Sequence, residues 1–115
     1  ENINILKATN YKESVKHILN KDINIDVALI DVFLPDVKDG FVVDFALKKK
    51  IPTLVLTSNE NLEKEKELLE KPIVEYIRKN TPKSIDYAVK SIARIIKNYD
   101  TNILIVDDSP LQLKQ

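Results

Sequence analysis

The sequence predicts an α/β fold in which five parallel strands form a doubly wound sheet with helices on both faces. Short apolar runs alternate along the chain with stretches whose apolar residues recur at helical spacing. Several of these runs are almost continuously apolar, which is typical of parallel strands that are covered on both faces. Because strands and helices alternate, we expect right-handed crossovers between neighbouring strands.

The first strand and helix are indicated by a change of period. Asn2–Ala8 alternates polar and apolar residues as a strand does. Thr9 and Asn10 then offer a cap for a helix over residues 12–19. We expect its buried face to consist of Val15, Ile18 and Leu19. The next apolar run, residues 27–32, is predicted to be a central strand.

The middle of the chain repeats this order. After Gly40, apolar residues at helical spacing predict a helix over residues 41–49, and Thr53–Thr57 is the next buried strand. Residues 61–70 alternate glutamate and lysine, which predicts a solvated helix that buries little. Its apolar anchors are Leu62, Leu68 and Leu69. We expect it to be the most loosely held helix.

The last elements complete the count of five strands. Residues 73–77 read as a strand, and Pro82 opens a helix that extends to Ile96. The face of this helix is predicted from Ile85, Ala88, Val89, Ile92 and Ile96. A further buried strand, residues 102–108, ends in two acids.

Composition excludes several classes of protein. Lysine plus arginine and aspartate plus glutamate each number 18, so the balanced charge does not favour direct contact with nucleic acid or an anionic membrane. The absence of cysteine excludes disulfides and thiolate metal sites. No apolar run has the length of a membrane span. We therefore expect a soluble, cytoplasmic protein with one core in its 115 residues.

Residues with phosphate or metal chemistry follow the predicted strands. Asp31, Thr57 and the pair Asp107–Asp108 each end a strand, and Arg78–Lys79 follows another. Ligand sites of such sheets lie at the carboxyl ends of the strands, where these side chains would meet. Carboxylates that gather in this way favour a hard divalent cation, and Mg²⁺ suits a site with few carboxylates and several waters. A carboxylate can then attack phosphorus and form an aspartyl phosphate.

The sequence resembles the receiver domains of two-component response regulators, which have the flavodoxin-like, chemotaxis-regulator-like fold. The resemblance rests on four motifs in this chain, namely Val106–Ser109, Leu29–Pro35, Leu56–Ser58 and Tyr76–Lys79. The motifs are specific in combination, although each alone is weak. The segment from Pro35 to Gly40 is one residue longer than is usual in that family.

The resemblance implies a role for each site residue. Asp31 would be the phosphoacceptor, and Thr57 and Lys79 would bind the phosphate oxygens. Mg²⁺ would be held by Asp31, Asp107, Asp108 and the backbone carbonyl of Phe33. Tyr76 would change with Thr57 as a switch. The partners would be a sensor histidine kinase or phosphotransfer protein and an output domain or downstream protein, in a phosphorelay in which the domain is not an enzyme in its own right.

The order of the motifs departs from that family. The strand with the acidic pair comes last here, whereas in receivers it comes first. We expect residues 1–98 to form a receiver that lacks its usual first strand and helix, and residues 102–115 to supply that strand and the start of that helix. The chain would then be a piece cut from a tandem-receiver protein. Two arrangements remain open: the last strand completes its own chain, as in a circular permutant, or a neighbouring copy in a swapped homodimer.

Each site residue also has an ordinary structural interpretation. Asp31 and the pair Asp107–Asp108 could act only as caps of turns or helices. Thr57 could simply end a strand, and Tyr76 could be a packing residue. Lys79 could be a solvated lysine. The single histidine, His17, is read as a surface residue.

Three functions are compared. The first is a phosphorylation switch at Asp31 that changes a partner surface over residues 61–98. The second is a receiver-like interaction module that cannot be phosphorylated, because this receiver's own acidic strand would be absent from the chain. The third is a phosphatase with an aspartyl nucleophile, but that class needs a second aspartate at the position of Phe33.

Overall fold

The computed structural model describes the chain except for residues 1, 58–61, 79–82, 96–99 and 108–115. Strands and helices alternate along it without exception in the described part. The strands are β1 (Asn2–Ala8), β2 (Val27–Asp31), β3 (Thr53–Thr57), β4 (Glu75–Arg78) and β5 (Asp100–Val106). The helices are α1 (Tyr11–Leu19), α2 (Phe41–Lys48), α3 (Leu62–Leu69) and α4 (Ser84–Ile95). The predicted α/β class and the predicted five parallel strands are confirmed.

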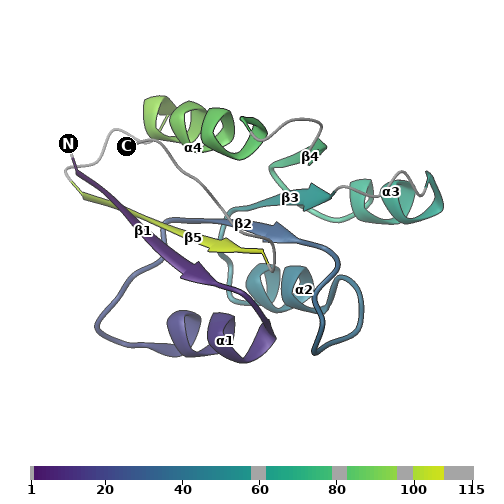
Figure 1. The fold of residues 1–115 in the computed structure, drawn as a ribbon, viewed down its shortest axis with the longest axis horizontal. Helices are drawn as coiled ribbons and strands as arrows, with labels where there is room; N and C mark the ends of the chain where they lie inside the picture. Colours follow the sequence, from purple (N-terminus) through teal and green to yellow (C-terminus); the bar gives the residue numbers. More distant parts are fainter. Residues whose placement is uncertain (1, 58–61, 79–82, 96–99, 108–115) are drawn as a thin grey trace.

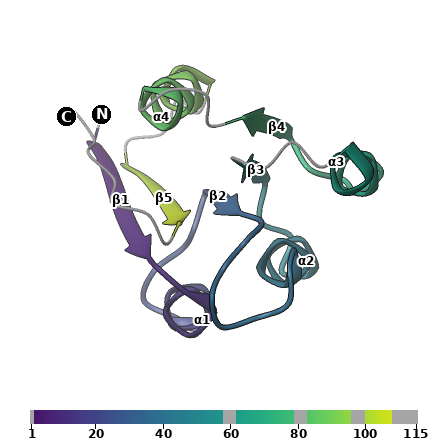
Figure 2. The same ribbon diagram turned by 45° about the vertical axis from the view of Figure 1, so that its right-hand side comes forward.

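The last strand of the chain lies inside the sheet. The strand order is β1-β5-β2-β3-β4, so β5 separates β1 from β2 (Figures 1 and 2). It is parallel to both neighbours, with Leu104 opposite Leu6 on one side and Ala28 on the other. The sequence left open whether residues 102–107 pair within their own chain or with another copy. In the structure they pair within the chain.

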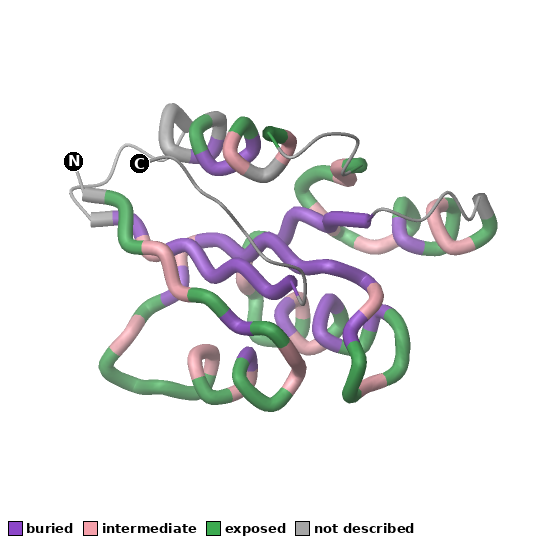
Figure 3. Tube along the Cα trace, in the orientation of Figure 1, coloured by how far each residue is buried: buried purple, intermediate pink, exposed green. Residues whose placement is uncertain are grey.

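The two faces of the sheet carry separate cores. Alternate residues of a strand point to opposite faces, and buried side chains divide accordingly. One cluster contains Ala28, Ile30 and Val106 with Val43 and Ala46 of α2, and α1 lies on the same side. The other contains Leu29 and Ile105 with Ala88, Val89 and Ile92 of α4. Figure 3 shows that burial is concentrated in the central strands.

Helix α1 begins where the capping residues predict. The side chain of Asn10 accepts a hydrogen bond from the Glu13 N–H at 2.8 Å, and Glu13 in turn accepts from Thr9. These paired bonds satisfy amides that the first helical turn leaves without partners. Val15 and Ile18 are half-buried as expected, but Leu19 is 54% exposed. Within α1 the fully buried residue is Ser14. The face that packs on the sheet therefore includes Ser14 and Tyr11 and leaves Leu19 outside.

Helix α3 and strand β4 differ in detail from the prediction. Leu68 is 1% exposed and anchors α3, whereas the expected anchor Leu69 is 59% exposed. The side chain of Leu62 lies outside the described set. Strand β4 begins at Glu75, two residues later than expected, because the amides of Ile73 and Val74 bond to Lys71 and Thr53 carbonyls ahead of the regular ladder. In the described residues no helix is both long and apolar enough to cross a membrane.

Candidate functional site

Asp31 and Asp107 end adjacent strands at the centre of the sheet. Asp31 is the last residue of β2, and Asp107 directly follows β5. Ile30 is paired with Val106, so the two aspartates occupy the next step of the same register. Neighbouring strands are about 4.8 Å apart, which places the two residues side by side. Their side chains are buried, with relative exposures of 5% and 1%.

The loop after Asp31 folds back on the strand ends. Oδ1 of Asp31 accepts a hydrogen bond from the Phe33 N–H at 3.0 Å. The Val32 N–H donates to the carbonyl of Leu56, and the Val32 carbonyl accepts from the Gly40 N–H at 3.0 Å. Gly40 has φ of 80°, which a glycine adopts without strain, and a Cβ there would meet nothing within 4 Å. The backbone conformation and not lack of space therefore favours glycine.

Thr57 and Tyr76 interact at the next strand ends. Thr57 closes β3 with 2% exposure, and Val55, two residues earlier in the strand, is paired with Tyr76 of β4. A side-chain hydrogen bond joins Thr57 to Tyr76. Burial raises the pKa of the Tyr76 hydroxyl above its ordinary value, and the charge of Glu65 raises it further. Arg78 and the bond with Thr57 act in the opposite direction but are weaker. The two residues predicted as a switch therefore touch each other.

Helix α3 is connected to this pair by charge. Arg78 ends β4, and its guanidinium lies 2.8 Å from Oε2 of Glu65 on α3. Glu65 is also the acid whose charge acts on Tyr76. From the sequence, Arg78 was a candidate cation at the carboxyl ends of the strands. In the structure its side chain is exposed and binds the carboxylate of Glu65 on α3. The strand ends are thus connected to α3 by a series of interactions, from Thr57 to Tyr76 and from Tyr76 to Glu65.

Two predicted site residues, Asp108 and Lys79, lie outside the described residues. Among the residues that are described, no group of three or more histidine, cysteine or acidic side chains has the geometry of a metal site. The predicted set needed Asp108 for its third carboxylate. The donors that are described, two buried carboxylates and the Phe33 backbone, are all oxygens. This donor chemistry fits Mg²⁺ better than a metal that prefers nitrogen or sulfur ligands.

Comparison with known proteins adds no assignment. The sequence matches no protein-family model and no curated protein.

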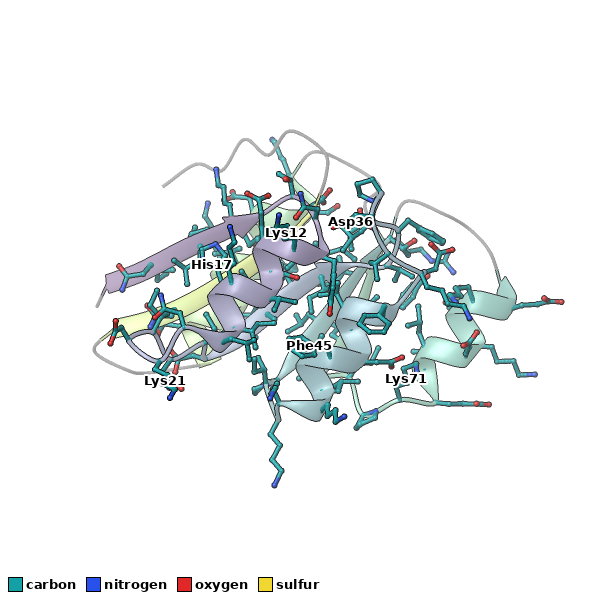
Figure 4. The ribbon with its side chains drawn as sticks, turned by 90° about the horizontal axis from the view of Figure 1, so that it is seen from below. Lys12, His17, Lys21, Asp36, Phe45 and Lys71 are labelled. Carbon is teal, nitrogen blue, oxygen red and sulfur yellow. The ribbon has the colours of Figure 1, made fainter. Side chains whose placement is uncertain are left out.

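Two contacts of α1 were not foreseen. Asp36, in the loop between β2 and α2, accepts hydrogen bonds from the Tyr11 and Lys12 amides (Figure 4). His17 was read as a surface residue, but it is half-buried and its Nε2 lies 3.1 Å from the Lys7 carbonyl. Both contacts join residues distant in sequence, so no local pattern indicates them.

Proposed function

We propose that the chain is a receiver domain of a two-component response regulator, with a flavodoxin-like fold in a permuted strand order. Asp31 takes a phosphoryl group from a histidine kinase or phosphotransfer protein, and the change is read by a partner or output domain. On this proposal residues 102–115 supply the strand and the beginning of the helix that residues 1–98 lack.

The observation that carries the proposal is the position of β5. This strand lies beside β2, so that Asp107 and Asp31 follow paired residues. Two buried carboxylates next to each other repel, and a bound divalent cation relieves this repulsion. An ordinary helix cap does not require a second buried acid on the adjacent strand.

The proposed reaction is a transfer between two side chains. A carboxylate oxygen of Asp31 forms a bond to phosphorus while the bond from phosphorus to the kinase histidine nitrogen breaks, and the electron pair of that bond leaves with the imidazole. The Thr57 hydroxyl and the Lys79 ammonium are assigned to the phosphoryl oxygens. The buried position of Thr57 supports this role, because a donor shielded from water stabilises developing charge most effectively.

Magnesium would supply positive charge for the oxygens of the incoming phosphoryl group. Asp31, Asp107, Asp108 and the Phe33 carbonyl are the assigned ligands. Phosphorylation would then reach α3 through Thr57, Tyr76 and Glu65. Leu68 anchors α3 while Leu69 points to solvent, so this helix has little apolar surface to hold it in one position.

Labelling with acetyl phosphate tests the assignment of Asp31. The native chain should gain one phosphoryl group in the presence of Mg²⁺, as seen by intact mass, and chelation of the metal should prevent it. Asp31→Asn should abolish the gain because the amide is not a nucleophile. Asp22→Asn, which changes an exposed acid in the turn after α1, is the control. Undiminished labelling of Asp31→Asn would falsify the proposed phosphoacceptor.

Beryllium fluoride with Mg²⁺ separates the switch from a module that only binds partners. As a phosphoryl mimic, it should shift the NMR signals of Thr57 and Tyr76. A chain that binds partners without phosphorylation would show no change at these residues. Asp107→Asn should weaken the response, since it removes one assigned metal ligand while keeping the size of the side chain.

A further inference from the structure

A single side chain joins the loop that follows Asp31 to helix α1. Asp36 accepts the Tyr11 N–H on Oδ1 at 2.9 Å and the Lys12 N–H on Oδ2 at 3.3 Å. Figure 4 shows Asp36 beside Lys12 at the beginning of the helix. The two partners are separated from Asp36 by 25 and 24 residues, so the contact is tertiary and is not a local helix cap.

These bonds complete the first turn of α1. The first amides of a helix have no partners within it. Asn10 satisfies Glu13 N–H, and Asp36 satisfies the two amides that precede it. A carboxylate at this end of a helix is also favoured by the positive end of the helix dipole. Helix α1 therefore depends on the position of the loop for the order of its first turn.

The same loop is anchored at the candidate site. Near its beginning the Phe33 amide donates to Oδ1 of Asp31, and at its end the Gly40 amide donates to the Val32 carbonyl. Just beyond the loop, the ring of Phe41 meets the ring of Tyr11 edge to face at 5.2 Å. The loop therefore has one anchor on Asp31 and another on α1, with few residues between them.

We propose that Asp36 is a positioning residue that couples α1 to the state of Asp31. A phosphoryl group on Asp31 changes the charge and the acceptor that the Phe33 amide meets. The loop adjusts at that anchor, and the adjustment reaches the Tyr11 and Lys12 amides through Asp36. The inference rests on the proposed function and adds α1 to it as a second responding element. Helix α1 lies near the β1 edge of the sheet, whereas α3 lies near the β4 edge (Figure 1).

The experiment compares amide signals with and without beryllium fluoride and Mg²⁺. In the native chain, we expect signals of Tyr11 and Lys12 to shift together with those of Thr57 and Tyr76. In Asp36→Ala the shifts at α1 should disappear while those at Thr57 and Tyr76 remain. Asp39→Ala, which removes an exposed acid from the same loop, should respond like the native chain.

Hydrogen exchange measured without any ligand shows whether Asp36→Ala is still folded. In Asp36→Ala, hydrogen exchange of the Tyr11 and Lys12 amides should become about tenfold faster, as expected for a lost helix cap. The amides of β2 should keep their protection if the chain is folded. If Asp36→Ala does not fold, Asp36→Asn provides the same comparison, because it removes the charge and one of the two acceptor oxygens.

The outcomes separate this inference from the proposed function. If Thr57 and Tyr76 respond but Tyr11 and Lys12 do not, or if α1 still responds in Asp36→Ala, the coupling is overturned and the switch stands. If no residue of the native chain responds, the proposed function fails and the inference fails with it.

Discussion

Tyr76 is the residue at which burial, charge and hydrogen bonding act on one group and can be separated. Burial and Glu65 raise the pKa of its hydroxyl, whereas Arg78 and Thr57 lower it. The side chain of Tyr76 is half-buried on β4. Its neighbours come from β3 and α3, and only the packing of those elements brings them to Tyr76.

The ionisation of Tyr76 should respond in opposite directions to two substitutions. Thr57→Val keeps the shape of the side chain but removes the hydroxyl, so the pKa of Tyr76 should rise further. Glu65→Gln removes a negative charge, so the pKa should fall. The pKa of Tyr76 in both variants is measured by ultraviolet titration. Comparison with Tyr76→Phe identifies the part of the absorbance change that belongs to Tyr76. A shift of equal sign in both variants would contradict the assigned causes.

The raised pKa of Tyr76 should also make the stability of the chain depend on pH above pH 10. Because the pKa is raised in the folded chain, the unfolded chain loses the Tyr76 proton first, at its ordinary value of 10.0. The contribution of Tyr76 to the free energy of unfolding is therefore present below pH 10 and is lost as the pH rises through its raised pKa. Urea unfolding of Tyr76→Phe should show a weaker loss of stability above pH 10 than the native chain does.

At the scale of elements, α1 shows how local and distant residues share one task. Asn10 and Glu13 form the local part of its N-terminal cap, and the sequence indicates Asn10 as a capping residue. Asp36 forms the distant part. Leu19 and Ser14 illustrate the same division, because the period predicts a helix but the sheet decides which side of it is buried.

The local cap of α1 should be measurable. Asn10→Ala removes the acceptor of the Glu13 amide and should lower the free energy of unfolding by about 1 kcal/mol in urea titrations. Lys16→Ala, on the exposed side of the same helix, should change it by less than about 0.5 kcal/mol. Equal effects of the two substitutions would argue against the cap.

Glu13 adds a pH dependence of opposite sign to that of Tyr76. The hydrogen bonds from Thr9 hold the pKa of the Glu13 carboxyl below its ordinary value of 4.5. The folded chain therefore keeps Glu13 charged at pH values where the unfolded chain binds a proton. Its stabilisation is present above pH 4.5 and is lost as the pH falls through the lowered pKa. Glu13→Gln should make unfolding less sensitive to pH in this range.

At the scale of the whole molecule, the fold depends on its last strand. β5 is the only described partner of β1, and it also pairs with β2. Its side chains contribute to both cores, Leu104 and Val106 to one and Ile103 and Ile105 to the other. A strand in this position joins the N-terminal strand β1 and the helix α1 that follows it to the rest of the sheet.

Substitution in β5 should therefore be costly. Leu104→Ala leaves a cavity in a fully buried site and should lower the free energy of unfolding by about 2 to 5 kcal/mol. Leu69→Ala removes the same atoms from an exposed position on α3 and should cost less than about 0.5 kcal/mol. If both variants unfold at the same urea concentration, β5 does not have the central position described.

The alternation of strands and helices and the acids at the strand ends could be predicted from the sequence, because periodicity and strand-ending residues are local properties of the chain. The buried residues of β2, β3 and α2 follow the predicted pattern for this reason. The pairing of β5 within its own chain, the exposure of Leu69, and the contact of Asp36 with α1 were decided only by the folded chain. Each of these depends on pairing between segments far apart in sequence, and the free energy of such pairing belongs to both partners, so neither segment's own pattern encodes it.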